Sequence, residues 1–179
     1  MQDEALIRRA QQGDAQAFEQ LLEAHYDTLF RFAYKWCGNR ADAEDVTQQA
    51  CIKLARSLDQ YRFESAFTSW LYRVVINCAR DWGRSQARHP ESAAEPDEQP
   101  LSAGDSGSPE RQVYSWQLLR QLEQLSDGLK ETLLLVHGEG LTHGEAAKVL
   151  DVKESTVSWR LHEIRKQFSL TAGGGGIYD

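Results

Sequence analysis

The sequence is poor in the residues that build disulfide and metal sites. Only three of its 179 residues are cysteines (Cys37, Cys51 and Cys78), and none belongs to a CxxC pair or a Cys/His cluster. An odd number of cysteines without metal-ligand spacing argues against a disulfide framework and against structural zinc. The histidines also lack a second ligand at metal spacing, so we expect neither a metal nor a cofactor. Since each cysteine lies among apolar residues, we expect these side chains to be buried.

Long apolar runs and targeting signals are missing as well. No run approaches the roughly 18–20 apolar residues that a membrane-spanning helix needs. The first 14 residues lack the charged-then-apolar layout of a signal peptide. We therefore expect a cytoplasmic protein with reduced thiols and no membrane insertion.

Proline is scarce and confined to one stretch. All four prolines fall within residues 86–112, where Leu101 is the only large aliphatic residue. Such a segment cannot bury enough apolar surface to offset the entropy lost on ordering it. The sequence therefore predicts a flexible linker over 86–112 between a helical domain at 1–85 and a second at 113–170. The glycine-rich residues 171–179 are predicted to form a disordered tail.

An excess of positive charge is also lacking. The chain has 27 acidic and 20 basic residues, a net charge of −7, which weighs against a nucleic-acid binder. The acidity is unevenly spread, because the linker alone holds six acidic and two basic residues. Binding depends on where charges lie rather than on their sum, so the overall count does not decide the question.

Outside the linker the pattern is helical, with no alternating strands between turn residues. Asp14 can cap a helix that ends at Gly38-Asn39, a second helix begins near Asp42, and a third follows Ser65 or Thr68. After the linker, helices are expected over 116–125 and 129–136, followed by two short ones. The predicted fold class is all-α, with two small helical domains joined by a flexible linker.

A polar stripe on the third helix and the aromatic residues before it form a first candidate site. Residues 62–88 carry five arginines and two acids. Arginines spaced along one helix face can follow a phosphate backbone, and an asparagine among them can hydrogen-bond a base. Aromatic residues beside a basic stripe are typical of sites that hold unstacked bases. The alternative, a solvated basic face beside a core aromatic cluster, remains open. The stripe is Arg73, Asn77, Arg80 and Arg84, and the aromatic residues are Tyr61, Phe63, Phe67 and Trp70.

Acidic and amide residues crowd the start of the second helix, at Asp42, Glu44, Asp45 and Gln48. Carboxylates there favour the helix dipole by about 0.3–1 kcal/mol each. Paired carboxylates could also serve acid–base catalysis, or they could dock a basic partner. No nucleophile, metal-binding histidine or phosphate-cradling glycine loop lies nearby. The motif alone does not decide between these interpretations.

The second domain carries the pattern of a helix-turn-helix. Thr142 and Glu145 form the T-x-x-E capping box that opens a helix. The next helix places Val157, Leu161 and Ile164 on one apolar face. Its other positions suit a recognition helix in the major groove, with Lys and Arg on phosphates. A helical hairpin used for protein contact is the alternative. The candidate DNA-binding residues are Ser155, Thr156, Ser158, Trp159, Arg160, His162 and Lys166.

Taken together, these motifs resemble the extracytoplasmic-function sigma factors of bacterial RNA polymerase. The run Asp42-Ala-Glu-Asp-Val-Thr-Gln48, the run from Phe67 to Arg73, and Asn77 are similar to region 2 of that family. The segment from Leu122 to Phe168, with its Ser155-Thr-Val-Ser-Trp-Arg-Leu161 run, is similar to region 4. The chain departs from the family at Ser158, where many members carry a basic residue, and at Trp159, where a small residue is usual.

The resemblance implies a transcription initiation factor and not an enzyme. It implies that the acidic helix start docks on the beta-prime clamp of core RNA polymerase, with a further contact at the beta flap. The aromatic segment and the third helix would recognise and melt the −10 promoter element, and the recognition helix would read the −35 element. An anti-sigma factor and a stress or envelope-signal regulon are also implied. An autonomous helix-turn-helix regulator and a helical protein-interaction module are the alternatives.

Overall fold

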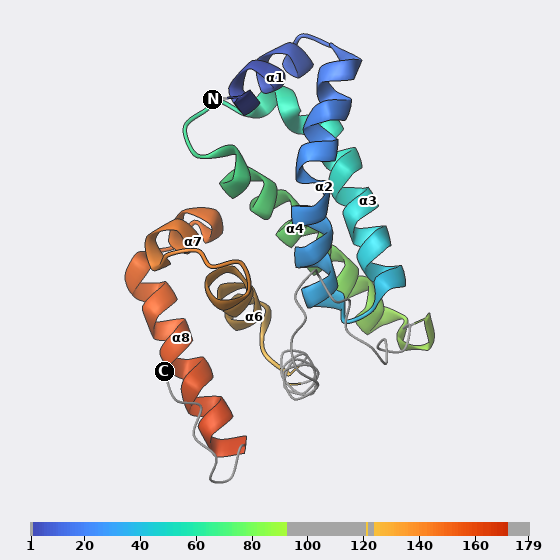
Figure 1. The fold of residues 1–179 in the computed structure, drawn as a ribbon. Helices are drawn as coiled ribbons and strands as arrows, with labels where there is room; N and C mark the ends of the chain where they lie inside the picture. Colours follow the sequence, from blue (N-terminus) through green and yellow to red (C-terminus); the bar gives the residue numbers. More distant parts are fainter. Residues whose placement is uncertain (1, 93–120, 122–123, 172–179) are drawn as a thin grey trace, which may run out of the picture. The chain divides into compact units, whose positions relative to one another are not determined.

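The computed structural model describes residues 2–92, 121 and 124–171. The chain divides into two units, residues 1–119 and 120–179, which are considered separately. Every regular element in the described ranges is helical and none is a strand, so the all-α prediction is confirmed (Figure 1). Most of the predicted linker and nearly all of the predicted tail lie outside these ranges. The described ends of those two segments hold the last turn of α4, a short turn η2 (Pro90–Ser92) and Thr171 of α8.

The first unit is built on three long helices, with α1 packed across one end (Figure 1). The sequence patterns did not delimit α1, although its first turn is acidic and Ile7 is only 2% exposed. The described elements are α1 (Gln2–Gln11), α2 (Ala15–Cys37), α3 (Arg40–Ser57), the 3-10 turn η1 (Leu58–Gln60) and α4 (Phe67–Arg88).

The ends of α2 follow the capping signals in the sequence. The Asp14 carboxylate accepts a hydrogen bond from the Ala17 N–H at 3.1 Å. That bond, together with the Arg9 guanidinium, lowers the pKa of Asp14. At the other end Gly38 adopts φ 77°, a left-handed conformation that glycine tolerates, and its N–H donates to the Tyr34 carbonyl at 2.9 Å. Both predicted ends of this helix are confirmed.

The next two helices start within two residues of the predicted positions. Helix α3 begins at Arg40, near Asp42, with Asn39 as its N-cap. Helix α4 begins at Phe67, two residues after Ser65, and its N-cap residue Ala66 supplies no side-chain hydrogen bond.

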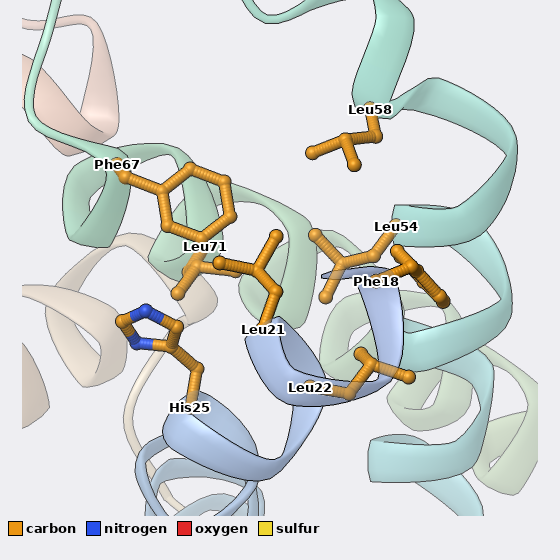
Figure 2. Close-up of a pocket in the computed structure, with 8 residues that line it drawn as sticks. All are labelled: Phe18, Leu21, Leu22, His25, Leu54, Leu58, Phe67 and Leu71. Atoms are coloured by element: carbon orange, nitrogen blue, oxygen red, sulfur yellow. The ribbon is translucent and has the colours of Figure 1, made fainter. Parts of the chain in front are cut away.

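The core of the first unit lies where α2, α3 and α4 meet. Leu21, Leu54 and Leu71, one from each helix, are at most 2% exposed (Figure 2). They line a cavity of about 10 Å³, at the lower limit for one water molecule. The His25 ring packs edge-on against Phe67 at 5.3 Å between centroids. This cavity is a packing gap in an apolar core, not a ligand site.

The second unit contains the predicted helix-turn-helix. Helix α6 (Asp127–Leu133) continues into a π-helical turn, η3 (Leu134–Gly138), and is followed by α7 (His143–Leu150) and α8 (Glu154–Thr171). The capping box is confirmed: Thr142 Oγ1 accepts from the Glu145 N–H at 3.2 Å, and Glu145 Oε2 accepts from the Thr142 N–H at 2.8 Å. The turn between α7 and α8 passes through Asp151 at φ 53°. The apolar face of α8 is buried at Val157, Leu161 and Ile164, as predicted.

Candidate nucleic-acid interface

The four predicted docking residues at the start of α3 fall into two pairs. Asp42 is buried, where Asn39 donates to its carboxylate at 2.7 Å and accepts from its N–H at 2.8 Å. Glu44 is exposed but lies 2.8 Å from the Arg40 guanidinium. These two carboxylates thus hold the helix start together. Asp45 and Gln48 are exposed side chains further along the helix.

An apolar side chain that was not among the predicted docking residues lies near Asp45 and Gln48. Ile52 is 39% exposed, one helical turn after Gln48. The sequence pattern could have identified Ile52 as exposed. A buried stripe runs through Val46, Ala50 and Leu54, and position 52 of an amphipathic helix lies outside that stripe. The exposed surface of α3 therefore combines acid, amide and isoleucine side chains.

The four aromatic residues of the predicted −10 surface do come together in one cluster. The Tyr61 ring lies 4.8 Å from Phe63, 5.3 Å from Phe67 and 5.4 Å from Trp70, centroid to centroid. Tyr61 and Phe67 are only 7% and 8% exposed, while the other two are half-buried. The Tyr61 hydroxyl donates to the Ser65 carbonyl at 2.6 Å. The ring area open to solvent therefore belongs to Phe63 and Trp70.

Phe63 has an uncommon backbone conformation in the loop between η1 and α4. Its φ of 60° lies in the left-handed region, which a bulky side chain rarely adopts. The Arg8 guanidinium carbon, from α1, lies 4.3 Å from the centre of the Phe63 ring. The loop is thus strained at one residue and covered there by a cation.

The polar stripe of α4 lies off the buried face of that helix. Asn77 and Arg84 are exposed, and Arg73 and Arg80 are half-buried. Arg84 forms an ion pair with Asp81. An exposed amide between arginines can hydrogen-bond a base while the guanidinium groups face phosphates.

On α8 the predicted contact residues are mostly exposed. Ser155, Ser158, Trp159, His162 and Lys166 are exposed, and Thr156 is half-buried. Trp159 is 59% exposed, the highest value among the large apolar residues that the structure describes. Ser158 Oγ lies 3.0 Å from His143 Nδ1 on α7, a contact that ties the two helices of the motif.

The Arg160 side chain forms hydrogen bonds with α6, unlike the other predicted DNA-binding residues of α8. Its Nη1 donates to the Gly128 carbonyl at 3.3 Å and to Thr132 Oγ1 at 3.4 Å. The same nitrogen is 3.8 Å from Glu131 Oε1, whose side chain is 2% exposed. Arg160 therefore connects α8 to α6. The sequence pattern placed it beside Trp159 on α8 but could not show this partner on a distant helix.

Nothing in the described ranges suggests catalytic or metal chemistry. No group of three His, Cys, Asp or Glu side chains there could hold a metal ion. Burial raises the pKa of the Cys51 and Cys78 thiols, which disfavours a reactive thiolate. Cys37 and Cys78 are buried as predicted, while Cys51 is half-buried. None of the described helices has both the length and the apolar character needed to cross a membrane.

Comparison with known families gives two matches, one for each unit. Residues 21–89 match Sigma-70 region 2, and residues 115–168 match Sigma-70 region 4. The chain is 32% identical over 174 residues to an ECF RNA polymerase sigma-E factor of Haemophilus influenzae, with 92% of each chain covered. These matches span the exposed α3 surface, the α4 stripe and the helix-turn-helix.

Two solved structures have a similar fold. One is CnrH in complex with the cytosolic domain of CnrY, at TM-score 0.71 and 23% identity, covering 97% of this chain and 99% of that one. The other is the sigma factor RpoE of Bartonella quintana in complex with the anti-sigma factor NepR, at TM-score 0.65 and 22% identity, covering 83% and 92%. At these identities the likeness concerns the fold alone.

Proposed function

The chain belongs to the extracytoplasmic-function sigma factors of RNA polymerase, and from this premise we propose how its surfaces divide the task of promoter recognition. As a member it is a non-enzymatic subunit that binds core polymerase and promoter DNA. The observation that carries the assignment is that sigma regions 2 and 4 match the two helical units in order. A lone helix-turn-helix regulator or an interaction module would leave the first unit unexplained.

The exposed side of α3 is the proposed docking surface for the beta-prime clamp. Asp45 and Gln48 are exposed and can meet basic and polar groups, and Ile52 supplies apolar area beside them. Asp42 and Glu44 support this surface indirectly, since they hold the helix start through Asn39 and Arg40. The division is consistent with interfaces that combine apolar anchors with a polar rim.

The −10 element is assigned to α4 and the loop before it. Asn77 and Arg84 are exposed on α4, with Arg73 and Arg80 flanking them on the same stripe. Phe63 and Trp70 offer the solvent-accessible ring area for an unstacked base. Tyr61 and Phe67 contribute by packing beneath those two rings.

The −35 element is assigned to α8. Trp159 and His162 lie one turn apart on the exposed face and can enter a major groove. Lys166 would neutralise a phosphate, and Ser158 is oriented by His143. The remaining proposed contacts are Ser155 and Thr156. Arg160 supports the helix from behind through α6.

The wider setting is also part of the proposal. We assign residues 1–85, 86–112 and 113–170 to region 2, linker and region 4, with a cytoplasmic location and a further contact to the beta flap. A stress or envelope-signal regulon is supported by similarity to a sigma-E factor. An inhibitory anti-sigma factor is supported by a neighbour of similar fold that was solved with one.

The docking assignment is tested by reversing one charge. Asp45→Arg should weaken binding to core polymerase at least about tenfold, because a carboxylate facing basic groups becomes a repelling cation. Asp27→Arg, an equal charge change at an exposed position of α2, is the matched control. Binding is measured with purified core polymerase, followed by runoff transcription. Equal core affinity for Asp45→Arg and the parent would refute the assignment.

The −10 assignment is tested at Asn77. Asn77→Ala should reduce open-complex formation about five- to tenfold by removing a hydrogen bond to a base, while core affinity stays at the parental level. Ser85→Ala, at an exposed position of the same helix, is the control. Permanganate reactivity of promoter thymines reports opening. If Asn77→Ala opens promoters as well as the control does, the stripe does not read the −10 element.

A further inference from the structure

We propose that α1 sets the shape of the loop that reads the −10 element, with Gln11 and Arg8 as positioning residues. The inference rests on the proposed assignment of residues 61–66 and α4 to the −10 strand. Neither residue belongs to the candidate DNA-binding set. Their role follows from three contacts that α1 makes with a segment about 50 residues further along the chain.

Gln11 hydrogen-bonds to both ends of η1, the turn that leads into the loop before α4. Its Nε2 donates to the Leu58 carbonyl and to the Tyr61 carbonyl, both at 2.9 Å. These carbonyls stand at the two ends of the 3-10 turn, where the Tyr61 N–H also donates to the Leu58 carbonyl at 3.2 Å. The amide is half-buried, so water cannot freely replace it. One side chain of α1 thereby fixes the direction in which the chain enters the loop.

Arg8 acts on the loop two residues further on. Its guanidinium lies over the ring of Phe63, the residue with φ 60°. Glu4 holds that guanidinium through Nε at 3.1 Å and Nη2 at 2.8 Å. A strained backbone conformation persists only when its surroundings over-determine it. The Arg8 guanidinium and the Tyr61 ring, which both contact the Phe63 ring, supply that constraint.

We expect the Gln11 and Arg8 contacts to affect which base the loop prefers, rather than whether α1 stays attached to the unit. Helix α1 is already anchored by Ile7, which is 2% exposed, so the polar contacts are not its sole attachment to the unit. Which unstacked base fits beside Phe63 depends on the shape of the loop. Loss of the Gln11 or Arg8 contact should therefore let the loop relax and lower the preference for the matched −10 base.

The test compares Gln11→Met with Gln12→Met in reconstituted holoenzyme. Gln12 is the exposed neighbour, so the same substitution there changes no contact with the loop. The probe is a fluorescent single strand carrying the −10 element of a promoter located by runoff transcription, together with versions changed at one base. Gln11→Met should bind the matched strand about five- to tenfold more weakly and the mismatched strands nearly as before. Gln12→Met should keep the parental ratio.

Arg8 supplies a second and independent variant. Arg8→Lys keeps a cation over the ring and should keep most of the base preference, whereas Arg8→Met should lose it. If Arg8 merely neutralised a phosphate, Arg8→Met would weaken all strands equally and reduce the salt dependence by about one counterion. That result would overturn the positioning role of Arg8.

The remaining outcomes are distinct from one another. Parental base preference in Gln11→Met refutes the inference. A fall in core affinity or thermal stability that accounts for the lost binding also refutes it, because the role is then only structural. A parent holoenzyme that shows no −10 preference refutes the proposed function itself. The inference is upheld when Gln11→Met and Arg8→Met lose the preference with core affinity intact, while Gln12→Met keeps it.

Discussion

Two aromatic residues of the first unit and one of the second lie in opposite environments. In the first unit Tyr61 and Phe67 are packed against one another and are at most 8% exposed. In the second unit Trp159 is 59% exposed on α8. In the sequence both sets lie near basic residues, and a core role for some aromatic residues of the first set was left open. An aromatic residue near arginines can therefore be the support of a surface or the surface itself, and only tertiary packing distinguishes the two.

The supports of the two surfaces also differ in range along the chain. The helix-turn-helix is shaped largely by neighbours, such as the Thr142–Glu145 box and the left-handed Asp151. The loop assigned to the −10 element is instead contacted by Gln11, which lies 47 and 50 positions before the two residues whose carbonyls accept its hydrogen bonds.

Removing a supporting aromatic residue should have the largest effect. Phe67→Ala should lower the free energy of unfolding of the first unit by about 3–5 kcal/mol, because it empties a buried site between His25, Tyr61 and Trp70. Denaturant unfolding of the full chain measures this. Phe67→Leu, which keeps apolar volume, should lose distinctly less. A loss below 1 kcal/mol for Phe67→Ala would mean that this ring is not a support.

Arg160→Met tests a contact in the second unit that joins residues about 30 positions apart in the sequence. It should lower the free energy of unfolding by about 1–3 kcal/mol, since Glu131 loses a partner in a buried setting. The salt dependence of duplex binding should not change, because Arg160 is turned toward α6. Lys166→Met is the contrasting variant and should reduce that dependence. A reduced salt dependence for Arg160→Met would place its guanidinium on DNA instead.

Trp159→Ala should affect binding to duplex DNA but not the stability of the fold. Stability should stay within about 0.5 kcal/mol, because an exposed side chain away from the core is lost. Holoenzyme affinity for duplex −35 DNA should fall by about 1–2 kcal/mol if the indole packs on a thymine methyl group. Deoxyuridine in place of −35 thymines should cost the parent more affinity than the variant. Equal costs for both proteins would exclude the methyl contact.

The smallest effect is expected from the local cap. Thr142→Ala should destabilise the second unit by about 1 kcal/mol by removing the N-cap oxygen of α7. Hydrogen bonds from the Thr142 N–H and hydroxyl lower the pKa of the Glu145 carboxyl. The stability that these two bonds supply is therefore fully present above the ordinary pKa of 4.5. It is lost as the pH falls through the lower folded-state value. The stability difference between parent and variant should therefore narrow in acid, where the 3.0 Å bond from Thr142 Oγ1 to Glu145 Oε2 loses its charged acceptor, while the share of the N-cap bond from the Glu145 N–H remains. A difference that stays constant down to low pH would contradict the side-chain part of the reciprocal cap.

Features that depend on local contacts were predictable from the sequence, and features that depend on contacts between distant residues were not. The ends of α2 and the capping box of α7 were predictable, because each depends on residues within four positions of the cap. The exact first residue of α4 was not, since Ala66 offers no capping side chain and the preceding loop is held by tertiary contacts. Local signals were sufficient only where local chemistry determines the structure.

The candidate surfaces were predicted as regions more reliably than as individual roles. Asp42 and Asp45 share one acidic run, yet the first is buried against Asn39 and the second is exposed. Arg160 lies on the predicted helix but contacts α6. Periodicity gives the face of a helix, while the partner of a side chain depends on elements far away in the sequence.

The exposed indole of α8 has a spectroscopic consequence. Trp36 is only 4% exposed, and Trp70 and Trp82 are half-buried, so these three indoles are shielded to different degrees. Trp159 is open to solvent, so among these four indoles acrylamide should quench its emission most strongly. Seating α8 in a major groove would shield that indole. The protein thus carries an intrinsic optical reporter on the helix assigned to duplex DNA, and following it requires no added label.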